Sequence, residues 1–241
     1  MTVMVEKRKP RKKSTDVFCC GYCGKEYKRE SSLTAHKCIE KDKHLSRETR
    51  EGKVAVELWV RFRKFYRIPI KKLATPYDAF ILSKEFNSFM EFARYMIENQ
   101  ILKSDEFVEY LFRESIPQKD WCAQKTRKQW ILKVLKDEHP TTGLTRSIHA
   151  IEEWSKDTGN EWNTFFEVVS APRFMMLLES GKISPWLVHA ASTRQLLLDR
   201  LSDEEFNYIF EYIDPSIWNV KKLRYKEDYE HIQNVLKDNG L

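Results

Sequence analysis

The chain beyond Gly52 spaces its hydrophobic residues as α-helices do. In the segment 54–66, apolar residues recur every three or four positions, which predicts one helix face turned toward a core. These residues are Val54, Leu58, Phe62, Phe65 and Tyr66. The segment 84–99 repeats this spacing, and no stretch shows a convincing strand-like alternation of apolar and polar residues. The pattern predicts an all-α, multi-helical globular domain of about nine or ten mostly short helices.

Capping residues mark where several of these helices should begin and end. Ser, Thr and Asp side chains accept hydrogen bonds from the free N–H groups of a first helical turn, and proline is tolerated in that turn. Predicted starts lie at Ser83, Thr75–Pro76, Ser184–Pro185 and Asp214–Pro215, and at the capping box of Ser202 and Glu205. Predicted ends lie at Gly159, Gly181 and Gly240, because glycine readily adopts the left-handed backbone that terminates a helix.

The composition is that of a folded protein without a membrane span. The 241 residues are 41% hydrophobic and 13% aromatic, enough apolar material for one large core or two smaller ones. No apolar run approaches the roughly eighteen residues of a spanning helix, and no apolar stretch follows the charged start as a secretory signal would require. The sequence therefore predicts a cytoplasmic protein with no membrane partner.

Charge is distributed unevenly along the chain, and the uneven distribution separates a basic amino-terminal part from the rest. Residues 1–50 contain 14 Lys and Arg against 7 Asp and Glu, whereas the rest of the chain contains 28 against 29. Such asymmetry is typical of a protein with a polyanionic partner, although a merely solubilising tail has the same composition. We expect a disordered basic arm at 1–16, a small module at 17–44, a linker at 45–53 and the all-α domain at 54–241.

The stretch FCCGYCGKEYKRESSLTAHKC, residues 18–38, contains four of the five cysteines and one histidine. Cys20 and Cys23 are separated by two residues, which suits a tight turn that presents two thiolates, and His36 follows after twelve more. The apolar positions of a small finger core are filled by Phe18, Tyr27 and Leu33. The stretch resembles the two-cysteine, two-histidine zinc fingers. That resemblance implies a ββα fold whose folding free energy comes largely from bound Zn²⁺.

The fourth ligand departs from that family, because no histidine or cysteine stands three to five residues beyond His36. Cys38 follows after one residue and His44 after seven. On a continuous helix, residues two apart point about 200° from each other, so His36 and Cys38 can share a metal only where the helix ends or tightens. We favour Cys38, because a thiolate binds zinc strongly at neutral pH. Cys19 is a weaker rival to Cys20.

The module and the arm carry basic residues that suit contacts to phosphates. These residues are Lys12, Lys13, Lys25, Lys28, Arg29 and Lys37. The positions that would face bases are filled by Arg29, Ser31, Ser32 and Ala35, and of these only Arg29 could make a bidentate contact to guanine. We therefore expect weak or non-specific binding, to DNA before RNA. The competing interpretation is that the zinc site only folds the module.

Other segments offer weaker candidates. The segment 59–72 mixes aromatic and basic residues, but helical spacing is expected to bury the aromatics and leave an ordinary charged face. His149 stands three and four residues before Glu152 and Glu153 and is expected to form a surface pair. The sequence shows no phosphate-binding glycine loop and no nucleophile motif, so we expect no enzymatic activity.

Three stretches of the body carry a second resemblance. They are GKVAVELWVRFRKFY at 52–66, GKISPWLVHAAS at 181–192 and DPSIWNVKK at 214–222. They are similar to uncharacterised proteins of large contractile-tailed bacteriophages that begin with a finger ending in the same histidine-x-cysteine pattern. The resemblance implies an infected host cytoplasm or a virion as location, and it implies no activity.

The sequence as a whole predicts a nucleic-acid-associated accessory protein. Its finger and arm would contact phosphates, and its helical body would dock a protein of the replication, transcription or packaging machinery. The alternative is a protein adaptor or structural component whose finger is only a folding element.

Overall fold

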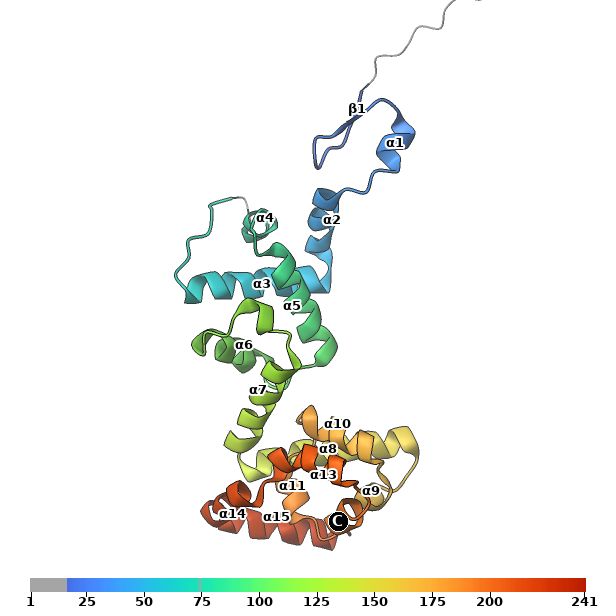
Figure 1. The fold of residues 1–241 in the computed structure, drawn as a ribbon, viewed down its shortest axis with the longest axis vertical. Helices are drawn as coiled ribbons and strands as arrows, with labels where there is room; N and C mark the ends of the chain where they lie inside the picture. The colour runs from blue at the N-terminus through green and yellow to red at the C-terminus, as the bar shows by residue number, and fades with distance from the viewer. Residues whose placement is uncertain (1–16, 74) are drawn as a thin grey trace, which may run out of the picture. The chain divides into compact units, whose positions relative to one another are not determined.

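The computed structural model describes residues 17–73 and 75–241. Within them the chain opens with a two-stranded antiparallel sheet, β1 (Phe18–Cys19) and β2 (Glu26–Tyr27), and continues as helices (Figure 1). This confirms the predicted fold class, a small ββα element followed by a multi-helical body. The expected arm at 1–16, with Lys12 and Lys13, lies outside the described residues.

The chain divides into two compact units, residues 1–93 and 94–241. The helices that begin in the first unit are α1 (Glu30–Thr34), α2 (Ile39–Leu45), α3 (Arg50–Phe65), α4 (Pro76–Ile81) and α5 (Phe86–Asn99), with a 3₁₀ turn at Ser46–Glu48. The boundary falls inside α5, whereas the sequence pattern predicts one domain over 54–241. Helix α3 already begins at Arg50, within the segment expected to be a linker.

The regular elements of the second unit's described residues are all helices. Its α-helices are α6 (Ser104–Arg113), α7 (Gln124–Asp137), α8 (Pro140–Thr158), α9 (Phe165–Val168), α10 (Ala171–Glu179), α11 (Pro185–Ala190), α12 (Arg194–Leu198), α13 (Asp203–Ile213), α14 (Pro215–Arg224) and α15 (Lys226–Asp238). Two 3₁₀ turns lie at Gln118–Asp120 and Trp162–Thr164. The described helices are more numerous than expected, because elements as short as α9 and α12 carry too few residues to show a period.

Most of the predicted helix boundaries are confirmed. Side chains of Thr75, Ser184, Ser202 and Asp214 accept backbone N–H groups at the starts of α4, α11, α13 and α14, and those of Thr75 and Ser202 complete capping boxes. Gly159, Gly181 and Gly240 all have positive φ angles. The expected cap at Ser83 is wrong: its hydroxyl is buried and makes no hydrogen bond, and α5 begins at Phe86.

Helix α3 turns only part of the predicted face toward the core. Its buried residues include Ala55, Leu58 and Trp59, whereas Phe65 is 46% exposed and Tyr66 39% exposed. The ring of Trp59 packs against that of Phe80 on α4 with centroids 5.5 Å apart, which anchors the first core. The register of α3 therefore follows its tryptophan, and the aromatic residues at its end remain at the surface.

The second unit has its own aromatic core. The fully buried rings of Trp186 on α11 and Trp218 on α14 meet edge to face with centroids 5.0 Å apart. Such pairs stabilise by about 0.5–1.5 kcal/mol beyond the area they bury. Trp218 also donates its indole N–H to the carbonyl of Tyr212 at 2.7 Å, which satisfies the polar atom inside the core. The packing explains why α11 and α14 are held together although thirty residues separate Pro185 from Pro215.

A buried ionic network fixes the start of α11 in the second unit. The Glu138 carboxylate accepts from the Ser184 hydroxyl at 2.5 Å and pairs with Arg146 at 2.6 Å. Ser184 also caps α11, and its backbone N–H donates to the Ser147 hydroxyl at 2.8 Å. Arg146 reaches further, to the carbonyl of Gly181 at 2.6 Å. One carboxylate thus joins three separate stretches of chain.

We expect Glu138→Gln to destabilise the protein by about 2–4 kcal/mol, because the amide leaves the Arg146 guanidinium without its buried counter-charge. Urea unfolding followed by far-UV circular dichroism measures this. The control is Glu153→Gln, which removes an exposed pair with Lys182 and should cost under about 1 kcal/mol. Equal midpoints for the two variants would contradict a structural role for the network.

Candidate metal centre

Cys20, Cys23, His36 and Cys38 come together at the start of the first unit. Each offers one ligand atom, and these four atoms all lie within 4.8 Å of one another. The sulfurs of Cys20 and Cys38 are 3.7 Å apart, and the Cys23 sulfur is 3.3 Å from Nε2 of His36. In the described part of the chain this is the group of such side chains that could hold a metal ion.

The first two cysteines are presented by the turn between β1 and β2. The Cys20 N–H donates to the Lys25 carbonyl at 2.9 Å, and the Gly24 N–H donates to the Cys20 carbonyl at 2.8 Å. Gly24 closes the turn with a φ of +70°, a backbone conformation that glycine adopts without strain. Backbone N–H groups of Cys23 and then Tyr22 point at the Cys20 sulfur and lower its pKa to about 7. The turn therefore favours the thiolate, which is the form that binds metal.

His36 and Cys38 can share one site because α1, the helix that follows the two-stranded sheet, ends before His36. Helix α1 stops at Thr34 and its C-cap is Ala35, so neither ligand belongs to a continuous helix. Cys38 has an extended backbone, φ −110° and ψ 106°, and forms the N-cap of the next helix, α2. The 200° separation expected on one helix is thereby removed. The break between α1 and α2 is what lets a histidine-x-cysteine pair share one metal.

Cys38 is the least solvent-exposed of the three thiols in the cluster. It is 4% exposed, and its sulfur accepts the backbone N–H of Lys41 at 3.4 Å in the first turn of α2. Burial raises the pKa of Cys38, and the Lys41 N–H opposes that effect. A buried thiol of this kind ionises most readily when a metal replaces the proton.

The rival ligands lie outside the cluster. Cys19 is exposed, and its thiol donates to the Gly24 carbonyl at 3.4 Å. His44 lies on α2 with its ring packed against that of Tyr22, centroids 5.6 Å apart. The geometry therefore selects Cys20 over Cys19 and Cys38 over His44.

The donor set fits a tetrahedral metal bound through sulfur and nitrogen. Zinc–sulfur bonds of about 2.3 Å and zinc–nitrogen bonds of about 2.0–2.1 Å place sulfurs about 3.8 Å apart and a sulfur and a nitrogen about 3.6 Å apart in a tetrahedron. The distances of 3.7 Å and 3.3 Å between the donor atoms come close to these edges. Three thiolates and one imidazole are a ligand set of structural sites, which leave no open position for substrate.

Few apolar contacts hold this module together. Phe18 pairs with Tyr27 across the hairpin, and the Tyr27 ring lies 5.2 Å from that of His36. Phe18, Tyr27 and Leu33 occupy the predicted core positions but all three are only half-buried. Within 17–45 the buried side chains are those of Cys20 and Cys38. The metal ligands thus occupy the centre that a larger domain would fill with hydrocarbon.

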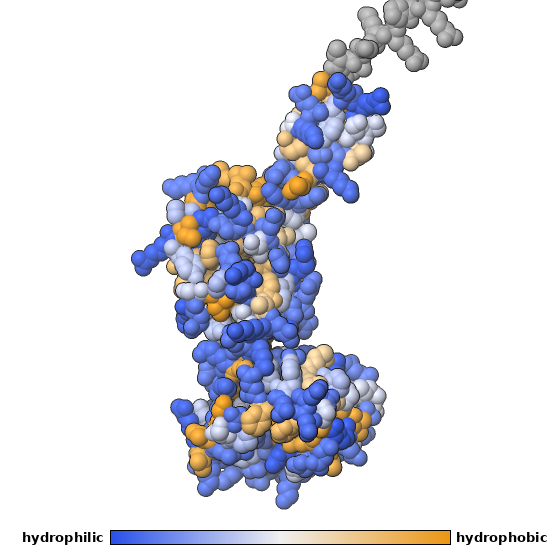
Figure 2. All heavy atoms as spheres, in the orientation of Figure 1, coloured by the Kyte–Doolittle hydropathy of each residue, from blue (hydrophilic) through white to orange (hydrophobic). Residues whose placement is uncertain are grey.

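Four of the basic residues proposed for phosphate contact lie at the surface of the module that contains the cluster. Lys25, Lys28, Arg29 and Lys37 are all exposed. In Figure 2 the visible face of this module is mostly hydrophilic. Lys25 extends over the Tyr27 ring at 5.9 Å, and Arg29 precedes α1 without capping it. Among the described residues, no carboxylate forms an ion pair with these four side chains.

The other sequence candidates have structural explanations. His149 and Glu152 form an exposed pair at 3.4 Å on α8, as expected. In the segment 59–72, Arg63 pairs with Glu85 at 3.2 Å and stacks on Trp59. Phe65 and Tyr66 contradict the prediction that they face the core, and with Lys64 and Arg67 they form an exposed basic and aromatic end of α3.

Comparison of the chain with protein-family models, with curated proteins and with solved structures finds no match. The resemblance to the phage proteins gains no support from these comparisons. No helix among the described residues is both long and apolar enough to cross a bilayer.

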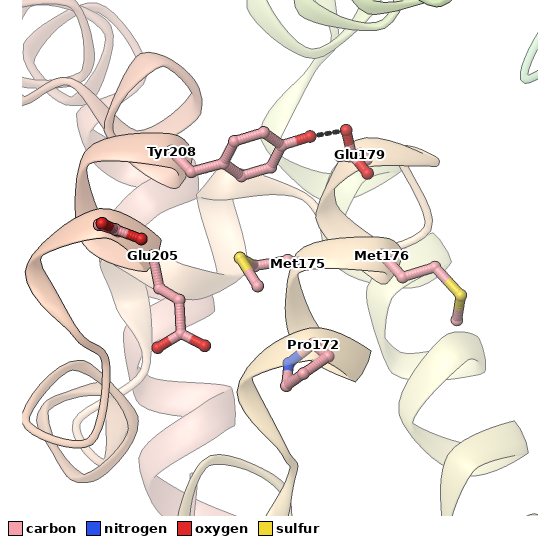
Figure 3. A pocket seen from close by; sticks show the side chains of 7 residues that line it. Pro172, Met175, Met176, Glu179, Glu205 and Tyr208 are labelled. Atoms are coloured by element: carbon pink, nitrogen blue, oxygen red, sulfur yellow. Dashed lines mark hydrogen bonds between the residues drawn. The ribbon is translucent and has the colours of Figure 1, made fainter.

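A groove between α10 and α13 in the second unit was not foreseen from the sequence. It encloses about 370 Å³ and is lined by Pro172, Met175, Met176, Glu179, Glu204, Glu205 and Tyr208. Figure 3 shows Met175 between the two helices and the Tyr208 hydroxyl bonded to Glu179. Its floor is apolar and its rim is acidic. Nothing local in the sequence signals such a groove, because its two walls are separated by the whole of α11 and α12.

We expect the purified protein to contain one zinc ion per chain and Cys38→Ser to lose most of it, because the serine hydroxyl does not replace a buried thiolate. Metal analysis after dialysis measures this. Cys19→Ser and His44→Asn are matched controls that should keep full occupancy. If His44→Asn loses zinc while Cys38→Ser keeps it, the ligand assignment is wrong.

Proposed function

We propose that this protein is a non-catalytic, zinc-dependent accessory factor that associates with nucleic acid and docks a protein partner through its helical body. The observation that carries the proposal is the compact cluster of Cys20, Cys23, His36 and Cys38 with exposed basic side chains around it. Zn²⁺ is the metal favoured by three thiolates and one imidazole. Its role is to fold the module and hold these side chains in place.

Phosphate is the group that the module suits best. Exposed lysines and arginines without carboxylate partners gain most from a polyanion, because they release its counterions without first breaking an ion pair. The exposed end of α3 belongs to the same unit and adds Lys64 and Arg67 beside Phe65 and Tyr66. Aromatic rings next to cations are typical of surfaces on which bases of a single strand stack.

Base-specific recognition is not part of the proposal. Of the four positions that would face bases, Ser31, Ser32 and Ala35 have short side chains that make few base contacts, which leaves Arg29 as the one side chain able to read guanine. Helix α1 has five residues, so it also offers little length to insert into a major groove. Weak binding to many sequences, DNA before RNA, fits these features. The resemblance to finger-bearing phage proteins would place such a factor in an infected bacterial cytoplasm or a virion.

The groove between α10 and α13 supports a protein-docking role for the body. Methionine side chains adapt to differently shaped apolar partners, and a rim of carboxylates selects for basic ones. A basic amphipathic segment of a replication, transcription or packaging protein has the required chemistry. This groove also favours the second candidate function, an adaptor whose metal site only folds the module and whose partners are proteins.

We expect full-length protein to bind duplex and single-stranded DNA at low salt, with affinity that falls as salt rises. The slope of log affinity against log salt concentration is negative. Replacing both Lys28 and Arg29 with Gln should make it shallower by about 2, because each lost phosphate contact lowers its magnitude by about 1. Fluorescence anisotropy with labelled oligonucleotides measures both. Exchanging Lys156 and Lys237 for Gln in the second unit is the matched control. Absence of salt-dependent binding by the zinc-loaded protein would leave the adaptor function.

We expect a peptide of alternating lysines and leucines to bind the groove between α10 and α13. Met175→Ser should weaken it about tenfold through lost apolar burial, and Glu179→Gln should reduce its salt dependence. Calorimetric titration of the full chain measures both, with Glu167→Gln as an exposed control. Affinities unchanged by Met175→Ser and Glu179→Gln would exclude this groove as the docking site.

A further inference from the structure

A second hollow in the 94–241 unit has a chemistry opposite to that of the acidic groove. It encloses about 300 Å³ and is lined by residues of α11, α12, α13 and α14 and of the turns next to them. Five of its lining side chains are polar: His189, Arg194, Gln195, Asn219 and Lys222. The volume lies at the lower end of the range for small-molecule sites, which usually combine apolar walls with a few convergent polar groups.

Two cations converge on this hollow without a matching carboxylate. The Arg194 guanidinium donates to the Ala191 carbonyl at 3.0 Å, and the Lys222 ammonium lies 5.4 Å from the Tyr229 ring centroid. Neither side chain forms an ion pair with an acid among the described residues. Asp199 is close in sequence, but its carboxylate accepts from the amide of Gln195 at 2.6 Å. The hollow therefore carries uncompensated positive charge.

The neighbouring groups respond to that charge. Burial lowers the pKa of Lys222, and Arg194 lowers it further. His189 on α11 has its pKa lowered to about 4, first by burial and then by Lys222 and Arg194. The imidazole is thus neutral at physiological pH. Two half-buried cations, at Arg194 and Lys222, account for the positive charge of the walls.

The apolar part of the hollow contains two aromatic rings at the surface. Phe206 is 38% exposed and Phe210 is 41% exposed, and they stand one helical turn apart on α13 with ring centroids 6.1 Å apart. Aromatic rings that stay exposed beside cations offer faces on which a planar group can stack. Both rings line the same hollow as Arg194 and Lys222.

We propose that this hollow is a binding site for a phosphate monoester joined to a planar ring, with Arg194 and Lys222 holding the phosphate and Phe206 and Phe210 contacting the ring. A phosphate monoester carries a charge of about −1.5 to −2 at neutral pH. This charge balances two unpaired cations more fully than the charge of about −1 on a carboxylate ligand would. The guanidinium can donate two parallel hydrogen bonds to phosphate, and the ammonium adds a point charge. Asn219 and Gln195 supply neutral polar groups at the wall.

The proposal does not involve the metal centre, which lies in the other unit. Its test can therefore fail while the metal-dependent function stands, and the reverse also holds. Cys38→Ser, which should remove zinc, is expected to leave binding of the phosphate ester unchanged.

Isothermal titration calorimetry of the full chain, with phenyl phosphate and adenosine monophosphate as separate probes, tests the site. We expect at least one probe to bind with a dissociation constant below about 1 mM, and Arg194→Gln and Lys222→Gln each to weaken it about tenfold or more. Arg224→Gln removes a cation from the same helix as Lys222 but outside the hollow, and should change nothing. The relative affinity of the two probes shows whether the site prefers a small aryl phosphate or a nucleotide as its ligand.

Two further probes and one variant separate the parts of the proposal. Inorganic phosphate and benzoate should each bind at least about tenfold more weakly than the better ester, and Phe210→Leu, which keeps the wall apolar, should weaken the ester several-fold. Circular dichroism melting of each variant confirms that it is folded. The proposal is overturned if neither ester binds, if inorganic phosphate or benzoate binds as well as the ester, or if Arg224→Gln weakens binding as much as Arg194→Gln.

Discussion

The module at residues 17–45 depends on a site where sulfur and nitrogen donors take the place of a hydrophobic core. In residues 17–45 the buried side chains are two cysteines, and the aromatic and aliphatic positions around them are only half covered. A module of this size buries too little apolar surface to offset the conformational entropy lost on ordering it. A bound metal contributes folding free energy that the packing lacks, and it does so only if all four donors meet at one point. The early end of α1 and the extended backbone at Cys38 satisfy that condition.

Several parts of this arrangement could be predicted from the sequence because their causes are local. The spacing of Cys20 and Cys23 determines a turn, and the cap residues before Pro76, Pro185 and Pro215 determine helix starts whatever the surroundings. The orientation of α3 could not be predicted in the same way. Phe65 and Tyr66 have the helical spacing of a core face, but Trp59 is buried against Phe80 and the two rings at the end of the helix stay exposed. Tertiary packing overrides periodicity where a larger side chain competes.

The groove and the cationic hollow show a second kind of feature that the sequence does not predict. Their walls come from α10 and α13 in one case and from α11 to α14 in the other, so each depends on the packing of segments that a linear pattern cannot place together. The stretch GKISPWLVHAAS gave no sign that its helix would border a hollow. Its sequence does contain the residues that anchor the helix: Ser184 caps α11 and bonds to Glu138, and Trp186 is buried in the core. The half-buried cations Arg194 and Lys222 lie on α12 and α14 and line the same hollow as this helix.

The charge of the metal centre bears on how the module can bind a polyanion. If the four donors hold Zn²⁺ as proposed, the ion with three thiolates and a neutral imidazole would have a net charge of −1, and residues 17–44 contribute six Lys and Arg against four Asp and Glu. The zinc-loaded module is therefore only slightly basic. Under the proposed function, any affinity of the module for phosphate would have to come from the placement of unpaired side chains at the surface rather than from net charge. Most of the basic excess of residues 1–50 is contributed by the segment before Val17, which holds six of the 14 Lys and Arg against two of the seven Asp and Glu. The module would thus position and orient a contact whose strength depends on the residues that precede it.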